Sequence, residues 1–205
     1  MAIKAIVFDI GGILIEESGS KSRELLEKKF NIHTDTFKEF AKKNLQQSFK
    51  GLHYNKFFSK LIKQLKLNLT PSQLSTEWVN ARNKISVYHK EIEELIKKLR
   101  KNYNVSCNTN TTILNDKSKA RIKAYRLFSF CIKSTQEKSA KPERKIYLTT
   151  IKKLKKLKIK PDEAIFIDDQ HENLPPAEKL GFRTILYKNT NQLIKSLNNS
   201  GVTWQ

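Results

Sequence analysis

The stretch Lys4-Ala5-Ile6-Val7-Phe8-Asp9-Ile10-Gly11-Gly12 decides how the rest of the chain is interpreted. Residues 4–8 form a short, mostly apolar run, which is typical of a strand that is buried inside a sheet. The run stops at the carboxylate of Asp9, and two glycines follow closely. In open parallel sheets, ligands bind beyond the carboxyl ends of the strands. This stretch therefore predicts a functional site at the end of a buried strand.

Beyond residue 100, segments typical of strands alternate with segments typical of helices. Strands are expected at residues 104–108, 127–132, 164–167 and 183–187, and helices at residues 116–124, 146–157, 174–180 and 191–197. Strands that alternate with helices predict a parallel sheet covered on both faces. We therefore expect an α/β fold with a doubly wound, Rossmann-like core.

Residues 20–100 have a different pattern, because apolar side chains recur there at helical spacing. Thr70-Pro71-Ser72-Gln73 is typical of a helix start, with threonine as the cap and glutamine three residues later. This block is too long for a simple crossover between two strands. We expect a helical cap at residues 16–99, inserted into a core formed by residues 1–15 and 100–205.

Four short segments carry residue types that suit chemistry at phosphorus, and three of them directly follow predicted strands. They are Asp9 with the two glycines, Thr109-Asn110, Lys141-Pro142, and Asp168-Asp169 with Asn173. Carboxylate and amide oxygens suit Mg²⁺, which would offset the repulsion between an attacking carboxylate and a phosphate dianion. A lysine adds positive charge against the transferring group, and threonine and asparagine can hydrogen-bond to phosphate oxygens.

The order and spacing of these residues resemble the haloacid dehalogenase-like hydrolase superfamily over nearly the whole chain. The subclass with a small helical cap is the most similar, near the sugar-1-phosphate phosphatases and the phosphatase domains of epoxide hydrolases. The resemblance implies a Mg²⁺-dependent phosphomonoester hydrolase that acts through an aspartyl-phosphate on a small phosphorylated metabolite, such as a sugar 1-phosphate. It implies these roles: Asp9 and Lys141 in catalysis; Thr109, Asn110 and Gly12 in substrate binding; and Asp9, Gly11, Asp168, Asp169 and Asn173 in metal binding, where Gly11 would use its backbone carbonyl.

The chain departs from the family pattern at Gly11, where most family phosphatases carry a second aspartate that serves as general acid and base. The loss of such a group costs roughly 10²–10⁴-fold in rate. Three explanations of the missing aspartate follow in order of preference. The first is that the leaving group needs little protonation, as an anomeric oxygen does, and the second is that another group such as His171 replaces the acid. The third is that the protein is catalytically weak and binds an anionic partner. A 2-haloacid dehalogenase ranks below these, because such enzymes usually carry Tyr-Gly-Thr at this point.

The bulk properties fit a globular enzyme with a positive charge. The chain has 205 residues and a formal net charge of +20, with lysines spread along its length. We therefore expect solvated lysine-rich faces, including a basic helix over residues 152–160 with Leu154 and Leu157 turned inward, and no nucleic-acid partner. No apolar run reaches the roughly 20 residues of a membrane helix, and residues 1–8 do not form a signal peptide. With two cysteines, taken as reduced, we expect a cytoplasmic monomer or homodimer.

Overall fold

The computed structural model describes residues 2–16, 19–32, 34–121 and 123–204. Within them, five parallel strands form one sheet in the order β5-β4-β1-β6-β7. The strands are β1 (Ala5–Phe8), β4 (Asn104–Thr109), β5 (Cys131–Lys133), β6 (Ala164–Asp168) and β7 (Arg183–Leu186). The expected doubly wound α/β sheet is confirmed, and β1 occupies its centre.

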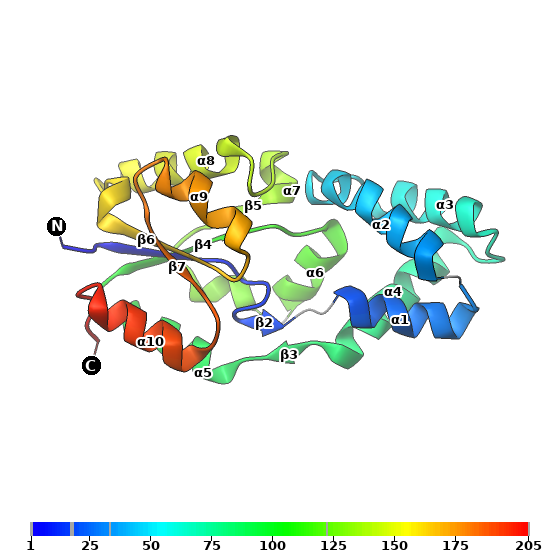
Figure 1. Ribbon diagram of the computed structural model, residues 1–205, viewed down its shortest axis with the longest axis horizontal. Helices are drawn as coiled ribbons and strands as arrows, with labels where there is room; N and C mark the ends of the chain where they lie inside the picture. The colour runs from blue at the N-terminus through cyan, green and yellow to red at the C-terminus, as the bar shows by residue number, and fades with distance from the viewer. Residues whose placement is uncertain (1, 17–18, 33, 122, 205) are drawn as a thin grey trace.

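Two apolar cores cover the two faces of the sheet. The helices of the core region are α5 (Lys90–Leu99), α6 (Ile113–Arg121), α7 (Ser134–Glu137), α8 (Arg144–Lys156), α9 (Leu174–Glu178) and α10 (Thr190–Asn199), with short 3₁₀ turns η1 (Ala124–Leu127), η2 (Pro161–Glu163) and η3 (His171–Asn173). Ile6 and Phe8 of β1 pack with α5 and α10, whereas Ala5 and Val7 pack with α8 and α9. Figure 1 shows these two helix pairs on opposite sides of the sheet.

The helices of the remaining segment form a bundle beyond the carboxyl end of β1, on the right of Figure 1. They are α1 (Gly19–Phe30), α2 (Thr34–Phe49), α3 (Tyr54–Leu65) and α4 (Pro71–Ile85). Their apolar side chains, among them Leu26, Phe37, Phe58 and Leu61, form a separate core. The two chain crossings between bundle and sheet lie side by side, since β2 (Ile15–Glu16) pairs antiparallel with β3 (Val87–Tyr88).

Helix α5 packs with the sheet and not with the bundle. Its residues Ile92, Leu95, Ile96 and Leu99 belong to the same core as Ile6 and Phe8 of β1. The chain therefore changes from packing with the bundle to packing with the sheet near β3. This point lies about one helix earlier in the chain than the expected boundary at residue 99. Sequence periodicity did not distinguish the two, because an amphipathic helix can turn its apolar face either to a sheet or to other helices.

Two expected elements are shorter in the structure. The strand expected at residues 127–132 begins only at Cys131, because η1 occupies the residues up to Leu127. The basic helix expected at residues 152–160 is helical only in part: α8 ends at Lys156, one residue before the helix end expected at 157, and Lys158 adopts a left-handed backbone conformation. Leu154 is buried as expected, but Leu157 is 46% exposed, and Ile159 is buried in its place.

The predicted helix start at Thr70 is confirmed and supports a stability prediction. The Thr70 hydroxyl accepts a hydrogen bond from the Gln73 backbone N–H, and the Gln73 side chain accepts one from the Thr70 N–H. Replacing Thr70 with alanine removes one of these bonds and should lower the free energy of unfolding by about 1 kcal/mol. Urea denaturation of the variant would measure this change, and Thr76→Ala, inside the same helix, is the matched control. An unchanged midpoint for Thr70→Ala would contradict the capping role.

Among the described residues, no helix is both long enough and apolar enough to cross a membrane.

Candidate active site

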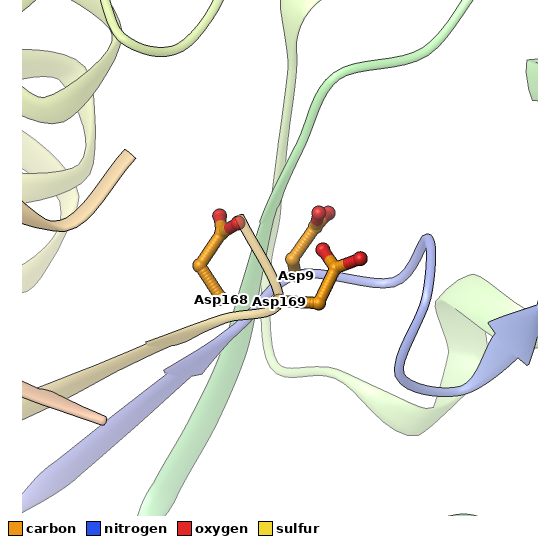
Figure 2. Close-up of side chains that lie close together, drawn as sticks. All are labelled: Asp9, Asp168 and Asp169. Atoms are coloured by element: carbon orange, nitrogen blue, oxygen red, sulfur yellow. The ribbon is translucent and has the colours of Figure 1, made fainter. Parts of the chain in front are cut away.

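Three carboxylates meet at the carboxyl ends of two neighbouring strands. Asp9 directly follows β1 and Asp168 is the last residue of β6, with which β1 pairs in parallel. Asp169 comes next in the chain. One oxygen from each of the three carboxylates lies within 4.8 Å of the others, and Figure 2 shows all three projecting beyond the strand ends. The sheet register alone thus explains why these residues converge.

Lys141 lies between two of these carboxylates. Its Nζ is 2.6 Å from Asp168 Oδ2 and 3.2 Å from Asp9 Oδ2, and it also donates to the backbone carbonyl of Asn108 at 3.0 Å. The side chain is fully buried. Burial alone would lower the pKa of Lys141, but the charges of Asp168 and Asp9 outweigh burial and raise it. The ammonium group therefore stays charged beside Asp9.

The two neighbouring aspartates have different surroundings. Asp168 is fully buried, and its second oxygen accepts hydrogen bonds from Asn173 Nδ2 and from the Gln170 N–H, both at 2.9 Å. Burial raises its pKa, as does the charge of Asp9, although Lys141 opposes the change. Asp169 is only half-buried and lines the cavity described below. Burial, followed by the charge of Asp9, raises the pKa of Asp169 to about 6. Asp168 thus holds Lys141, whereas Asp169 is the aspartate of the pair that faces the cavity.

The predicted substrate-binding pair lies at the carboxyl end of β4, and its side chains make hydrogen bonds within the protein. Asn110 Oδ1 accepts from the Lys141 backbone N–H at 2.8 Å, and Asn110 Nδ2 donates to the Lys141 carbonyl at 2.9 Å. This two-point contact fixes the loop that presents Lys141. Thr109 is fully buried below the cavity, where its hydroxyl donates to the Asn110 carbonyl at 3.4 Å. Asn173 likewise uses its amide group to orient Asp168.

The two glycines after Asp9 differ in how much space surrounds them. Gly12 has a φ of +74°, and a Cβ atom at this position would lie 2.1 Å from Asp169 Oδ2. A side chain at Gly12 would therefore displace the Asp169 carboxylate. A Cβ atom at Gly11 would meet nothing within 4 Å. Gly11 thus leaves open space near Asp9 in the lining of the cavity.

Gly12→Ala should therefore weaken divalent metal binding. The new methyl group moves Asp169, and the positive φ adds strain of roughly 1–2 kcal/mol for any residue other than glycine. We expect the Mg²⁺ affinity, measured by calorimetry, to fall by about tenfold or more, which is the usual scale for a displaced metal-site contact. Gly11→Ala is the matched control, since its Cβ atom has room. Equal Mg²⁺ affinities for both variants would contradict the close approach of Gly12 to Asp169.

The donor set fits a magnesium ion. Asp9 and Asp169 offer carboxylate oxygens toward the cavity, and Gly11, which also lines it, offers a backbone carbonyl. Hard oxygen donors around a cluster of negative charge are what Mg²⁺ requires. The described residues place no histidine or cysteine in this cluster, so the chemistry of the donors does not favour zinc.

A cavity of about 730 Å³ separates these carboxylates from the helical bundle. Its floor is formed by residues at the strand ends, and its opposite wall by side chains of α1–α4 and the loop after α2. The bundle residues that line it are Arg23, Leu45, Gln46, Ser48, Phe49, Leu52, Tyr54, Phe57, Phe58, Trp78 and Arg82. The sequence alone did not single out the two arginines, because no motif marks them. His171 is exposed and does not line the cavity.

This sheet order, with a carboxylate cluster and a lysine at its centre, defines a hydrolase of the haloacid dehalogenase-like class. Residues 3–181 match the haloacid dehalogenase-like hydrolase family. The chain belongs to this family.

The relatives are of two kinds. The chain is 35% identical over 105 residues to bifunctional epoxide hydrolase 2 of Rattus norvegicus, a match that covers 48% of this chain and 18% of the rat protein. The match thus spans less than a fifth of that relative's length. The fold is similar to that of a haloacid dehalogenase family enzyme from Bacteroides thetaiotaomicron, BT-2542, solved in complex with magnesium and inorganic phosphate: the TM-score is 0.76 with 25% identity over 91% of this chain and 95% of that one. A family hydrolase of Porphyromonas gingivalis shares the fold with a TM-score of 0.69 and 22% identity over 97% and 98% of the two chains.

Proposed function

We propose that this protein is a magnesium-dependent phosphomonoester hydrolase in which Asp9 is the nucleophile. The observation that carries the proposal is the position of Lys141, whose buried ammonium lies 3.2 Å from Asp9 and 2.6 Å from Asp168 at the floor of a large cavity. A positive group held next to a nucleophilic carboxylate suits attack on an anionic phosphate. The Bacteroides relative, which binds magnesium and phosphate, supports the same chemistry here.

The residues would act in sequence. Asp9 attacks phosphorus, the ester oxygen leaves, and an aspartyl-phosphate forms; water then releases inorganic phosphate and restores Asp9. Lys141 neutralises the transferring group, Asp168 and Asn110 hold Lys141, and Asn173 holds Asp168. When bound by Asp9, Asp169 and the Gly11 carbonyl, Mg²⁺ would reduce the repulsion between carboxylate and phosphate.

We propose that helices α1–α4 serve as a cap. They line the wall opposite Asp9, and both chain connections to the sheet pass through the short β2–β3 ribbon. A second link is the ion pair between Lys50, after α2, and Glu143, at the start of α8. Closure of such a bundle over the floor would exclude water and select the substrate.

The direct test is release of phosphate from p-nitrophenyl phosphate with Mg²⁺ and with EDTA. The proposal expects Mg²⁺-dependent release that EDTA abolishes. Halide release from 2-chloropropionate without Mg²⁺, and no phosphate release, would instead favour a dehalogenase, which the absence of an acid at Gly11 also allows. No activity on either substrate or on a panel of sugar phosphates, combined with salt-sensitive binding of RNA or DNA, would favour a binding protein.

The open space at Gly11 gives a prediction about the leaving group. Gly11→Asp should place a general acid beside Asp9 without a clash, because its Cβ atom has room. A general acid contributes roughly 10²–10⁴-fold where the leaving oxygen needs a proton. We therefore expect hydrolysis of glycerol 2-phosphate to rise about tenfold or more relative to p-nitrophenyl phosphate, whose phenolate leaves unprotonated.

Gly11→Asn is the matched control, because it has nearly the same shape and no acidic proton. An unchanged ratio in Gly11→Asp, or an equal rise in Gly11→Asn, would contradict the interpretation that the natural substrate has a leaving group that departs without an acid.

A further inference from the structure

The wall of the cavity that faces Asp9 carries charge of only one sign among the described residues. Helices α1–α4 contribute two charged side chains to it, and both are arginines, Arg23 from α1 and Arg82 from α4. The acidic side chains that line the cavity, Asp9, Glu16, Asp169 and Glu172, all lie outside the bundle. A ligand that spans the cavity therefore meets a carboxylate site at one end and guanidinium groups at the other.

The two arginines belong to adjacent helices, and at least one is held in place. Helices α1 and α4 pack directly against each other. Arg23 Nε donates to Glu27 Oε1 at 3.1 Å, one turn further along α1, and the Arg23 side chain is only 18% exposed. Glu27 is buried and does not line the cavity, whereas Arg23 does. An arginine oriented in this way loses little further freedom when it binds an anion.

The bundle wall of the cavity that carries the two arginines also carries aromatic side chains. Phe57, Phe58 and Trp78 pack against one another with ring centroids 5.3–6.1 Å apart, and all three line the cavity. Such a wall excludes water, which strengthens the attraction between a guanidinium group and an anion. A neutral sugar has no group of matching charge for the arginines and little flat apolar surface for the rings.

We propose that Arg23 and Arg82 bind a second anionic group of the substrate, a carboxylate or a further phosphoryl-type group, on an aromatic or apolar body. This inference rests on the proposed function for the first phosphate, which Asp9 and Lys141 receive. It also agrees with Gly11, since an aryl oxygen leaves with little help from an acid. The protein would then prefer aryl-type phosphomonoesters with a negative charge at the far end over the 1-phosphates of neutral sugars.

The test compares ligands that differ only in the distal group. 4-Carboxyphenyl phosphate and 4-phosphonophenyl phosphate carry a second negative charge, and 4-carbamoylphenyl phosphate is their neutral counterpart. Dissociation constants are measured by calorimetry with Mg²⁺ on the Asp9→Asn variant, so that binding is measured without turnover. One charge-assisted hydrogen bond corresponds to about tenfold or more in affinity. We therefore expect at least one of the anionic ligands to bind about tenfold or more tightly than the amide, and the one that does identifies the distal group.

The arginines are then replaced in the same background. Arg82→Gln, and Arg23→Gln together with Glu27→Gln so that no buried carboxylate is left without Arg23, should each reduce the preference for the anion. The combined variant should abolish it. Arg100→Gln, an exposed arginine outside the cavity, should retain it. The quantity compared between variants is the ratio of the dissociation constants of the neutral and anionic ligands. Any difference in affinity that does not depend on the arginines contributes equally to this ratio in every variant.

Two results would overturn the inference: equal affinity for all three ligands with the arginines intact, or a preference that persists in the combined variant. Failure of the proposed function would look different. In that case the wild-type protein would release no phosphate with Mg²⁺ from any of these esters, whatever the binding preference.

Discussion

Asp9→Asn is expected to reduce phosphate release by roughly 10⁴-fold or more, because an amide does not serve as a nucleophile toward phosphorus. The variant should remain folded. Its Oδ1 atom can still accept the hydrogen bond from the Ile10 N–H, which is 2.7 Å long in the structure. Lys141 also keeps its shorter contact with Asp168. Steady-state kinetics with p-nitrophenyl phosphate measures the loss, and circular dichroism checks the fold.

Asp116→Asn is the matched control for this substitution. Asp116 lies on α6, does not line the cavity, and pairs with Lys133 at 2.9 Å. The control should retain activity close to that of the wild type. The loss of a nucleophile usually reduces the rate by far more than about a hundredfold. If Asp9→Asn kept more than about a hundredth of the wild-type rate, Asp9 would therefore not be the attacking group.

Lys141→Met is expected to have the largest combined effect on stability and activity. The substitution leaves Asp168 buried without its cation, and a buried ion pair that loses one partner costs about 3–5 kcal/mol. It also removes the positive charge beside Asp9, and the loss of one such electrostatic contact typically costs about 10²–10³-fold in kcat. Urea denaturation and phosphatase kinetics measure the two effects separately.

A second substitution distinguishes the structural contribution of Lys141 from its catalytic one. Lys141→Met combined with Asp168→Asn removes the stranded carboxylate, so the double variant should regain much of the lost stability. Its activity should stay low, because the charge next to Asp9 is still absent. A double variant that recovered activity along with stability would show that Lys141 acts only through folding.

Much of the fold was predictable because local sequence and tertiary structure agree. Residues 5–8 are apolar on both sides of the strand, and they form the central strand of the sheet with helices on both faces. The basic helix expected at residues 152–160 extended too far for a specific reason. Lysine and leucine are both good helix formers, so propensity favoured continuation through residues 152–160. The structure instead turns at Lys158 and buries Ile159, so tertiary packing outweighed local preference.

The site was predictable only in part. Residues at strand ends could be placed together from topology alone, which explains why Asp9, Asp168 and Asp169 converge as expected. Lys141 instead comes from the loop before α8, where the pairing with Asn110 holds it. The hydrogen bonds of Asn110 and Asn173 could not be foreseen, because the choice between binding a ligand and orienting a neighbour depends on side-chain geometry. Arg23 and Arg82 gave no signal in a chain with 40 lysines and arginines. Their importance depends on the packing of α1 against α4, which no short motif encodes.

The most direct test of the account is to identify the residue that becomes phosphorylated during turnover. The wild-type protein would be mixed with p-nitrophenyl phosphate and Mg²⁺, quenched in acid within the first turnovers, digested with pepsin at low pH, where an acyl phosphate survives, and analysed by mass spectrometry. The account predicts one added phosphoryl group on the peptides that contain Asp9, located at Asp9 by fragmentation and absent from Asp9→Asn. Steady phosphate release with no phosphoryl group on Asp9, or with the group on another residue, would contradict it.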